Sequence, residues 1–415
     1  MSPPSSLPSF FPTTSSKLAA PSRMTASPPS PSHLLRSHSH EITAVFVSED
    51  NDRIYSGDAS GRVVATSTRS LRPILSWAPH TDSILGVQEC GARIFTHSRD
   101  HKLHVWTRLD DIPSSERVGG SAALVDLPTP TLCYSMDVNS LNFCRFSLLP
   151  GQSEDALIAL PNLVESSEAD IWSLPSKQRI HASVGTQRKQ NIFSTQGREG
   201  MKTGIIMSLH LFRGPRPSEG SSSSSGGELR LLCAYEDGGV VLRRFVGSGT
   251  HVGPEQEISI EGRGWDVIWR HKLHVESIMA MRVSRDNSFA LTVSADNLVG
   301  KYDLSSTKES ESGTIHRTKH PKNGCVAIRD DGRVCAVGGW DGSVRLYSTK
   351  SMKPLGTLRY HKGASQAVEF AHSDAGAADD DEFTFEEQRA RARWLVVGSK
   401  DHRVSLWTLM SFEKT

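Results

Sequence analysis

Histidine, serine and aspartate lie close together at several places in this chain, and such groups can bind metals or perform catalysis. His97, His101 and His104 would suit a metal ion if they shared one face of a helix. Ser98 and Ser399, each near a histidine and an aspartate, would suit a hydrolase triad. Both sets, however, fall on a strand–turn–strand pattern that is repeated along the chain. We therefore expect structural roles, and we predict no catalytic residue, no metal site and no cofactor.

The repeated pattern consists of short apolar strands, with a polar turn before the last strand and an aromatic residue at its end. It is clearest in SRDHKLHVW and SKDHRVSLW, where Asp100 and Asp401 occupy the turn and Trp106 and Trp407 end the strand. Seven such turns can be aligned, and the closest are separated by roughly the 40–45 residues of one four-stranded propeller blade. Radial packing of such sheets buries their faces and protects their edges. The sequence therefore predicts an all-β fold, a seven-bladed WD40 β-propeller.

Within these repeats a histidine precedes the turn, and a serine often lies two residues before the aspartate. We interpret these groups as a buried hydrogen-bond chain from histidine through serine and aspartate to the tryptophan N–H, which locks the strands of a blade. A buried aspartate needs such partners because an unpaired buried charge is costly. The residues expected in these locks are His80, Ser98, Asp100, Trp106, His274, Asp296, His320, Asp341, His361, Ser399, Asp401 and Trp407.

Three repeats depart from the pattern. In the first, His40 takes the histidine position and Ser60 replaces the turn aspartate. Ser166 replaces it in the third, and Arg243 replaces the terminal aromatic residue in the fourth. The first, third and fourth blades should therefore be less regular than the others.

The domain organisation follows from composition. Residues 1–32 are rich in serine and proline and have too little apolar surface to offset the entropy of ordering, so we expect a disordered tail. Residues 33–415 form the predicted propeller, in which the seventh blade lacks an outer strand because the chain ends soon after the last repeat. We expect the strand in 33–38 to pair with 403–409 and close the ring. Inserted loops are expected near 185–203, 213–228, 304–318 and 372–393.

Overall composition excludes several classes of function. The 47 basic and 46 acidic residues balance, so no general electrostatic attraction to nucleic acid is expected. The six cysteines form no CxxC pair, which favours buried thiols in a reducing compartment. No apolar run approaches the roughly 20 residues of a membrane span, and no signal peptide is apparent. We expect an intracellular protein without membrane contact.

A surface for other proteins is the remaining prediction from the residues themselves. The residue before each turn aspartate should lie on the rim of one face of the disc, and these positions include Arg99, Glu236, Trp340 and Lys400. An exposed tryptophan near cations is typical of a protein-binding hot spot. The alternative is that Trp340 packs against a neighbouring loop. The acidic run DDDE in 372–388 has two interpretations. It is either a solvent-exposed acidic segment or a binding site for a basic partner.

Blocks such as HTDSILGVQECGARIFTHSRDHKLHVW (80–106) and GCVAIRDDGRVCAVGGWDGSVRLYSTKSMKPLGTLRYHKG (324–363) resemble the fungal ASTRA-associated protein 1 family. That family consists of WD-repeat proteins related to the G-protein β-like group, and the resemblance extends from about residue 33 to the end. It implies a non-enzymatic subunit of the nuclear ASTRA complex, with other subunits of that complex as partners. It also implies links to chromatin remodelling and to maturation of the phosphatidylinositol-3-kinase-related kinases. No functional residue of the family is carried over to this chain.

Three readings of the function stay open from the sequence. The first is a scaffold in the nucleus, with the cytoplasm as an alternative location. The second is a G-protein β-like signalling adaptor, against which the Ser/Pro-rich N-terminus argues because it lacks the heptads of a coiled coil. The third is a propeller that binds histone tails or other peptides in its central channel. Direct contact with nucleic acid is not expected in any of them.

Overall fold

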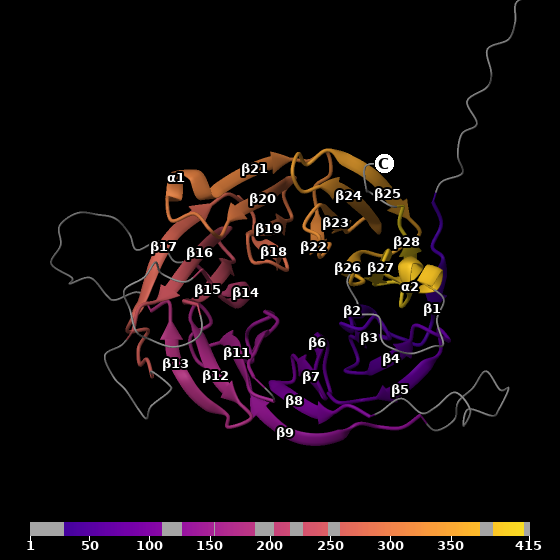
Figure 1. Ribbon diagram of the computed structural model, residues 1–415, viewed down its shortest axis with the longest axis horizontal. Helices are drawn as coiled ribbons and strands as arrows, with labels where there is room; N and C mark the ends of the chain where they lie inside the picture. The colour runs from indigo at the N-terminus through magenta and orange to yellow at the C-terminus, as the bar shows by residue number, and fades with distance from the viewer. Residues whose placement is uncertain are drawn as a thin grey trace, which may run out of the picture.

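The computed structural model describes residues 29–109, 127–152, 154–186, 203–215, 227–247, 258–373 and 385–410. In these residues the chain forms seven four-stranded antiparallel sheets, which are arranged as the blades of a ring (Figure 1). Each blade begins with its inner strand and continues outward in chain order, except for the blade that contains both ends of the ring. The seven-bladed, all-β fold predicted from the repeats is confirmed.

The first four blades follow one another from the indigo to the rose part of Figure 1. Blade 1 consists of β2 (Ile42–Val47), β3 (Arg53–Asp58), β4 (Val63–Ser67) and β5 (Pro73–Trp77). Blade 2 consists of β6 (Ile84–Cys90), β7 (Arg93–Ser98), β8 (Lys102–Thr107) and β9 (Thr131–Asp137). Blade 3 consists of β10 (Ser147–Pro150), β11 (Ala156–Pro161), β12 (Ala169–Leu174) and β13 (Gln178–Val184). Blade 4 consists of β14 (Ile206–Arg213), β15 (Leu229–Tyr235), β16 (Gly239–Phe245) and β17 (Trp265–Lys272).

The remaining blades complete the circle in orange and yellow. Blade 5 consists of β18 (Ile278–Val283), β19 (Phe289–Ser294), β20 (Leu298–Asp303) and β21 (Gly313–Arg317). Blade 6 consists of β22 (Asn323–Ile328), β23 (Val334–Gly339), β24 (Ser343–Ser348) and β25 (Pro354–Arg359). Blade 7 consists of β26 (Ser365–Phe370), β27 (Trp394–Ser399), β28 (Val404–Thr408) and β1 (His33–Leu35).

The apolar core lies between neighbouring blades, because each sheet has two faces to cover. Between blades 6 and 7, for example, Ala336 and Val344 pack in one buried cluster with Phe370 and Val397. The second strand of a blade is covered on both faces, so β23 and β27 are buried along their whole length. Burial of this kind removes apolar surface from water and drives the ring to close.

Strand β1 closes the ring as expected from the sequence. It runs antiparallel to β28, with His33 opposite Leu406 and Leu35 opposite Val404. The backbone N–H of Ser32 also donates to the carbonyl of Leu406 at 2.8 Å. Ser32, the last residue of the predicted tail, is therefore already part of blade 7. The rest of that tail up to residue 28 lies outside the described residues.

The structure corrects one predicted insert and leaves the others partly undescribed. Residues 304–318 were expected as an irregular loop, but they contain α1 (Glu309–Ser312) and the outer strand β21. The strand is mostly exposed, so it lacks the apolar alternation by which strands are recognised. Within 372–393, the helix α2 (Phe385–Arg391) precedes β27. Most of 185–203 and 213–228 lies outside the described residues.

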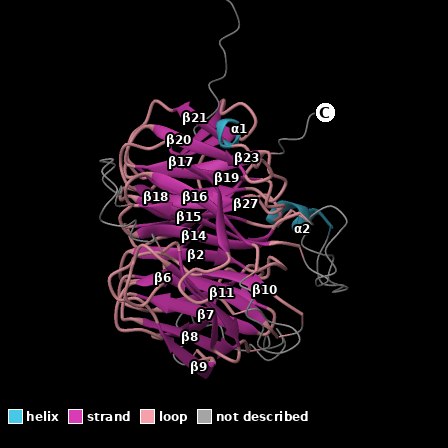
Figure 2. Ribbon diagram, turned by 90° about the vertical axis from the view of Figure 1, so that its left-hand side faces the viewer, coloured by secondary structure: helices cyan, strands magenta, loops and turns pink. Residues whose placement is uncertain are grey.

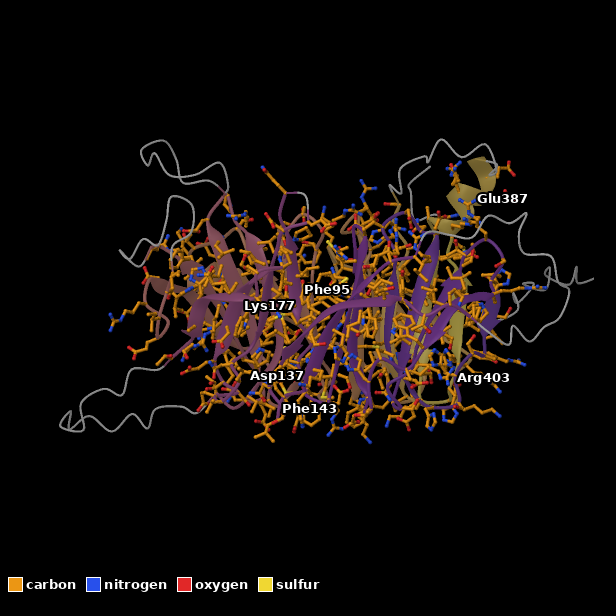
Figure 3. The ribbon with its side chains drawn as sticks, turned by 90° about the horizontal axis from the view of Figure 1, so that it is seen from below. Phe95, Asp137, Phe143, Lys177, Glu387 and Arg403 are labelled. Atoms are coloured by element: carbon orange, nitrogen blue, oxygen red, sulfur yellow. The ribbon has the colours of Figure 1, made fainter. Side chains whose placement is uncertain are left out.

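Strand direction divides the disc into two faces. Because the strands of a blade are antiparallel, the turn between the second and third strands lies at the same end as the entry to the next inner strand. We call this end the turn face, and it carries Asp137, at the end of β9, and Phe143 along the lower edge of Figure 3. Helix α2, with Glu387, projects from the opposite face, and Figure 2 shows it standing out from the ring seen edge-on.

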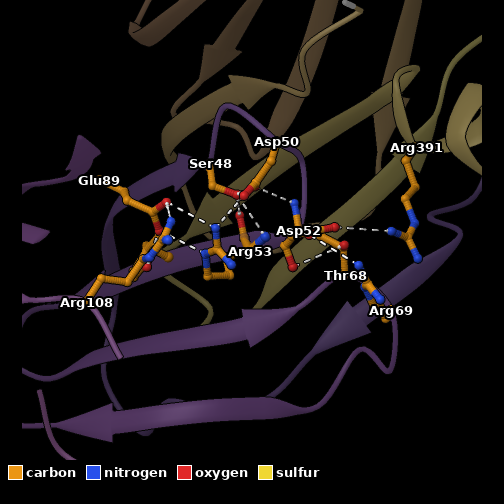
Figure 4. A network of polar contacts seen from close by, with 10 residues as sticks. Ser48, Asp50, Asp52, Arg53, Thr68, Arg69, Glu89, Arg108 and Arg391 are labelled. Carbon is orange, nitrogen blue, oxygen red and sulfur yellow. Dashed lines mark hydrogen bonds and ion pairs between the residues drawn. The ribbon is translucent and has the colours of Figure 1, made fainter. Parts of the chain in front are cut away.

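A buried polar network joins blades 1 and 2 near the opposite face (Figure 4). Glu89 accepts hydrogen bonds from Arg53 Nε at 2.9 Å, from the Tyr55 hydroxyl at 2.5 Å and from Arg108 Nη1 at 3.1 Å. Asp50 forms a second ion pair with Arg53. Burial raises the pKa of Tyr55, and Glu89 adds to the increase, so the hydroxyl stays protonated and donates. The network leaves no charge of Glu89 unpaired inside the fold.

Candidate protein-binding surface

The polar residues that could do chemistry are used first to lock the blades. In blade 2, the Asp100 carboxylate can only accept, so His80 donates to it from Nδ1 at 3.0 Å. Nε2 of His80 then accepts from the Thr96 hydroxyl at 2.9 Å, and Trp106 Nε1–H donates to the same hydroxyl at 2.9 Å. Burial lowers the pKa of His80, which favours the neutral ring that this chain requires.

Blade 7 contains a similar lock, but its bridging hydroxyl comes from the third strand, β28, and not from the second strand as in blade 2. His361 contacts Asp401 through Nδ1 at 3.0 Å and Ser405 through Nε2 at 2.7 Å. Trp407 Nε1–H donates to the Ser405 hydroxyl at 2.9 Å. These side chains are withdrawn from the surface, and their hydrogen-bonding groups are satisfied by one another. Their arrangement provides rigidity and offers no free nucleophile for catalysis.

Blade 5 contains a third lock of the same kind. Nδ1 of His274 lies 3.0 Å from Asp296 Oδ2, and Nε2 lies 2.8 Å from the Thr292 hydroxyl. Tyr302 stands where the other two locks have tryptophan, and its hydroxyl lies 3.2 Å from that of Thr292. The structure therefore brings His80, His274 and His361 together with the turn aspartates that the repeats paired with them.

The hydroxyl in the lock is not the predicted serine. Ser98 donates to the backbone carbonyl of Asp82 at 2.7 Å, and Ser399 donates to that of Gly363 at 3.0 Å. Each thus ties its turn to the connection that enters the inner strand. Thr96 is the bridging group in blade 2, two residues before Ser98 and on the same side of the strand. A buried hydroxyl at that position was the signal in the sequence.

We expect Thr96→Val to destabilise the protein by about 2 kcal/mol, because it leaves buried nitrogens of His80 and Trp106 without a partner. Valine has nearly the same shape, so the loss reports the hydroxyl and not the packing. Urea unfolding followed by tryptophan fluorescence measures the change. Thr96→Ser keeps the hydroxyl and should cost less, and equal losses in the two variants would contradict the role of the hydrogen bonds.

In blade 1, the histidine and the carboxylate of the lock lie at other positions than the sequence predicted. His38, and not His40, contacts Asp58 through Nδ1 at 2.7 Å and Ser56 through Nε2 at 2.7 Å. Ser60 keeps the turn position and donates to Asp58 at 2.6 Å. Burial alone would raise the pKa of Asp58, but hydrogen bonds from His38 and Ser60 lower it to about 2. A shift of two residues keeps the carboxylate on the same side of the strand, so the lock survives.

Blade 6 lacks the predicted histidine lock. His320 is exposed, and Asp341 is bound instead by Arg345, with Nη2 at 2.5 Å from Oδ2 and Nη1 at 3.3 Å from Oδ1. Arg345 occupies the strand position that corresponds to Ser405 in blade 7. A guanidinium neutralises the turn aspartate directly, so the histidine is not needed and lies at the surface.

The histidines that suggested a metal site do not converge. His101 lies in the turn with a φ of 69°, whereas His97 is buried in the preceding strand. The ring of His104 stacks on His80 with 4.6 Å between the ring centroids. The described part of the chain contains no group of three side chains that could hold a metal ion. None of its helices is long and apolar enough to cross a membrane.

The four predicted rim residues are all exposed in turns of the turn face, but they form no single patch. Arg99, Glu236, Trp340 and Lys400 belong to blades 2, 4, 6 and 7. The Arg99 guanidinium lies 4.7 Å from the centroid of the Phe143 ring. Lys400 Nζ forms an ion pair with Glu41 at 3.3 Å. The four rim residues belong to turns of four different blades and do not contact one another.

Trp340 is partly exposed and partly packed against a neighbouring segment of the chain. Its side chain is 44% exposed, and its backbone N–H donates to the carbonyl of Lys322 at 2.9 Å. A Cβ at Gly324 would lie 3.2 Å from two atoms of the indole ring, so the glycine makes room for it. Beside the ring is a hollow of about 400 Å³ lined by His320, Pro321, Lys322, Trp340, Asp341 and Arg345.

Sequence reasoning missed a set of exposed apolar side chains on the turn face. They lie in turns or at strand entries, where the alternation of a strand does not require them. Each is more than a third exposed, and the set is Leu141, Phe143, Leu163, Val164, Val275, Met279 and Trp340. Exposed apolar side chains that gather on one face are typical of surfaces where other proteins bind. The signal in the sequence was an apolar residue in a polar connection, as in SLNF and HVES.

At the centre of the turn face, the entries of the seven inner strands surround a hollow of about 310 Å³, which we call the channel mouth. Its walls include the apolar side chains of Leu85, Phe143, Met207, Met279 and Met281. Three guanidinium groups also line it, those of Arg99, Arg145 and Arg282. Among the described residues, no carboxylate lines this hollow, and Glu369 lies beside it in an ion pair with Arg282.

Comparison with known proteins gives a consistent result. The family model for ASTRA-associated protein 1 matches residues 31–406. A relative named ASTRA-associated protein 1 from Verticillium alfalfae is 32% identical, over 92% of this chain and 93% of that protein. Relatives of the same name from Penicillium rubens and Schizosaccharomyces pombe are 30% and 25% identical, over 92% of this chain and 98% and 99% of theirs. The resemblance stated from the sequence blocks is confirmed, and the chain belongs to the ASTRA-associated protein 1 family.

Proposed function

We propose that this protein is a non-enzymatic scaffold subunit of the ASTRA complex, and that it binds other subunits through its turn face. The name of its relatives, ASTRA-associated protein 1, supports the association with that complex. The observation that carries the proposal is the set of exposed apolar side chains on one face of a rigid ring. In three blades, the histidines and aspartates that could have taken part in catalysis are hydrogen-bonded to one another in the locks. This supports a binding role over catalysis.

We further propose that the protein acts in the nucleus, in chromatin remodelling and in the maturation of phosphatidylinositol-3-kinase-related kinases. The family resemblance is the support for these roles. Depletion of the protein should lower the steady-state amount of these kinases without lowering their messenger RNA. Unchanged kinase levels after depletion would argue against the role in their maturation, while leaving the scaffold role open to its own test.

We expect the double variant Trp340→Ala and Val275→Ser to lose binding to the other ASTRA subunits while the fold stays intact. Both side chains are exposed, so truncating them costs little folding energy, whereas an anchor removed from an interface costs about 2 kcal/mol or more. That loss corresponds to a reduction of roughly thirtyfold in affinity. Affinity purification of the tagged full-length chain, with quantitative mass spectrometry, measures recovery of the subunits.

The matched control is Ile315→Ala with Leu355→Ser, which removes similarly exposed apolar groups from the outer strands β21 and β25. This control should recover the subunits at wild-type level. Equal losses in the two double variants would contradict a specific role of the turn face. If the wild-type chain recovered no ASTRA subunit, the proposed function itself would fail.

The charge of the channel mouth disfavours a reader of histone tails. Such tails are rich in lysine and arginine, and a channel that binds them needs carboxylates. Here the guanidinium groups of Arg99, Arg145 and Arg282 line the hollow, and the adjacent Glu369 is already paired. Like charges brought together across an interface suppress binding. We therefore propose the scaffold and not the histone-tail reader.

A further inference from the structure

The channel mouth contains a cation without a counterion. Arg145 lies two residues before the inner strand β10 and lines the hollow at the centre of the ring. Within the described residues, its guanidinium group has no hydrogen-bond or ion-pair partner. Arg282 in the same hollow is paired with Glu369, and Arg99 lies over the Phe143 ring. The three arginines and one carboxylate thus leave two positive charges uncompensated.

This arrangement is unfavourable for the free protein. Withdrawal from water and the nearby charge of Arg282 lower the pKa of Arg145 to about 10, whereas Glu369 opposes the shift. The arginine nevertheless remains charged at neutral pH. A cation held in a low-dielectric site without a partner costs stability, and a ligand that supplies the missing anion recovers that energy. An anion is therefore the chemistry that this hollow lacks.

The surroundings of Arg145 indicate which anion fits. Arg99 is held over the Phe143 ring, so Arg145 is the guanidinium left to bind an anion in the hollow. One guanidinium matches one carboxylate, which it can bind with two parallel hydrogen bonds. A phosphate dianion is more strongly hydrated than a carboxylate, so its transfer into a partly apolar hollow costs more. The wall of Met207, Met279, Phe143 and Leu85 offers contact for apolar groups next to the anion. Methionine and aromatic side chains adapt to such groups and favour a mixed acidic and apolar segment.

We propose that the channel mouth binds an acidic peptide segment of a partner protein, with an aspartate or glutamate side chain on Arg145 and a neighbouring apolar side chain on Met279 and Phe143. The proposal rests on the proposed function, because it names the chemistry of the partner that the turn face binds. It also explains why the apolar set and the unpaired arginines occupy the same face. Arg99, which covers Phe143, lies at the edge of this site and guides the acidic segment inward.

The test begins with selection of binding peptides from a random 12-residue display library on the immobilised full-length protein. We expect the selected sequences to be enriched in aspartate and glutamate next to leucine, phenylalanine or methionine. A labelled selected peptide should bind the wild-type protein at least tenfold more tightly than Arg145→Gln. Its counterpart with asparagine and glutamine in place of the acids should lose binding to a similar degree.

Two control variants separate the site from general charge. Arg145→Lys retains the positive charge and should keep part of the affinity, whereas Arg270→Gln removes an exposed charge from the outer strand β17 and should bind like wild type. Thermal unfolding of Arg145→Gln should occur at the same or a higher temperature, because the variant removes an uncompensated charge. A clear loss of stability would instead indicate a structural role for Arg145.

Other outcomes would overturn the proposal. Selected peptides without acidic residues, equal affinity for wild type and Arg145→Gln, or failure to select any peptide would each contradict it. Tighter binding of a phosphoserine version, or of a single-stranded oligonucleotide, would show that the site is built for phosphate. Recovery of ASTRA subunits by Arg145→Gln in the purification described above would leave the scaffold function standing while the acidic segment fails.

Discussion

A chain that begins at residue 41 is expected to unfold at a markedly lower temperature than one that begins at residue 29. The shorter chain loses β1, whose ladder pairs with β28, and the buried side chain of Leu35. It also loses His38, which donates to the buried carboxylate of Asp58. Lost hydrogen bonds, lost apolar burial and the loss of the histidine partner of Asp58 together cost on the order of 5 kcal/mol.

Differential scanning fluorimetry of the two truncated chains measures this effect. The variant His38→Ala in the longer chain removes the lock of blade 1 but keeps the closing strand. We expect it to produce the smaller part of the decrease in melting temperature. Loss of β1 also exposes the unpaired edge of β28, to which a strand of another molecule can pair. In size-exclusion chromatography, part of the shorter chain should therefore elute as larger species. Equal melting temperatures of the two chains would show that β1 does not hold the ring closed.

The second large effect is expected for Glu89→Ala, which should lower the free energy of unfolding by about 3–5 kcal/mol. Glu89 is buried and is the common acceptor for Arg53, Tyr55 and Arg108 (Figure 4). Its removal takes away the acceptor that these three side chains share. The cost arises because the remaining partners stay inside the fold without their shared acceptor.

The control is Glu154→Ala, which removes a glutamate of the same type from an exposed ion pair with Arg93 at 3.0 Å. Exposed pairs of this kind contribute about 1 kcal/mol or less, so this variant should stay close to wild type in urea unfolding. Glu89→Gln keeps the shape and part of the hydrogen bonding and should fall between the two. A loss below 1 kcal/mol for Glu89→Ala would show that the network is not essential for stability.

The sequence alone determined the repeat, the blade number and the closing strand, because these depend on patterns that are local in the chain. Alternation of apolar residues, the turn aspartate and the terminal aromatic side chain recur with the length of one blade. His80, His274 and His361 precede their turns in the same way and reach the aspartates expected for them. The lone strand at the start of the propeller completes blade 7 because that blade lacks an outer strand.

Local spacing did not determine which polar groups meet. Arg345 reaches Asp341 and leaves His320 at the surface, although the spacing of His320 matches that of the true locks. His38 and Asp58 replace the expected pair in blade 1 because a shift of two residues keeps the same side of a strand. Such outcomes depend on the length and charge of a neighbouring side chain, which a spacing pattern does not include.

The candidate binding surface was decided by the tertiary structure. Arg99, Arg145 and Arg282 are distant in the chain and come from three different blades, yet they line one hollow. No spacing in the sequence predicts this, because the centre of the ring exists only after all seven inner strands have met. The sequence determined the chemistry available in each blade, and closure of the ring decided which of these groups face the same space and which remain without a partner.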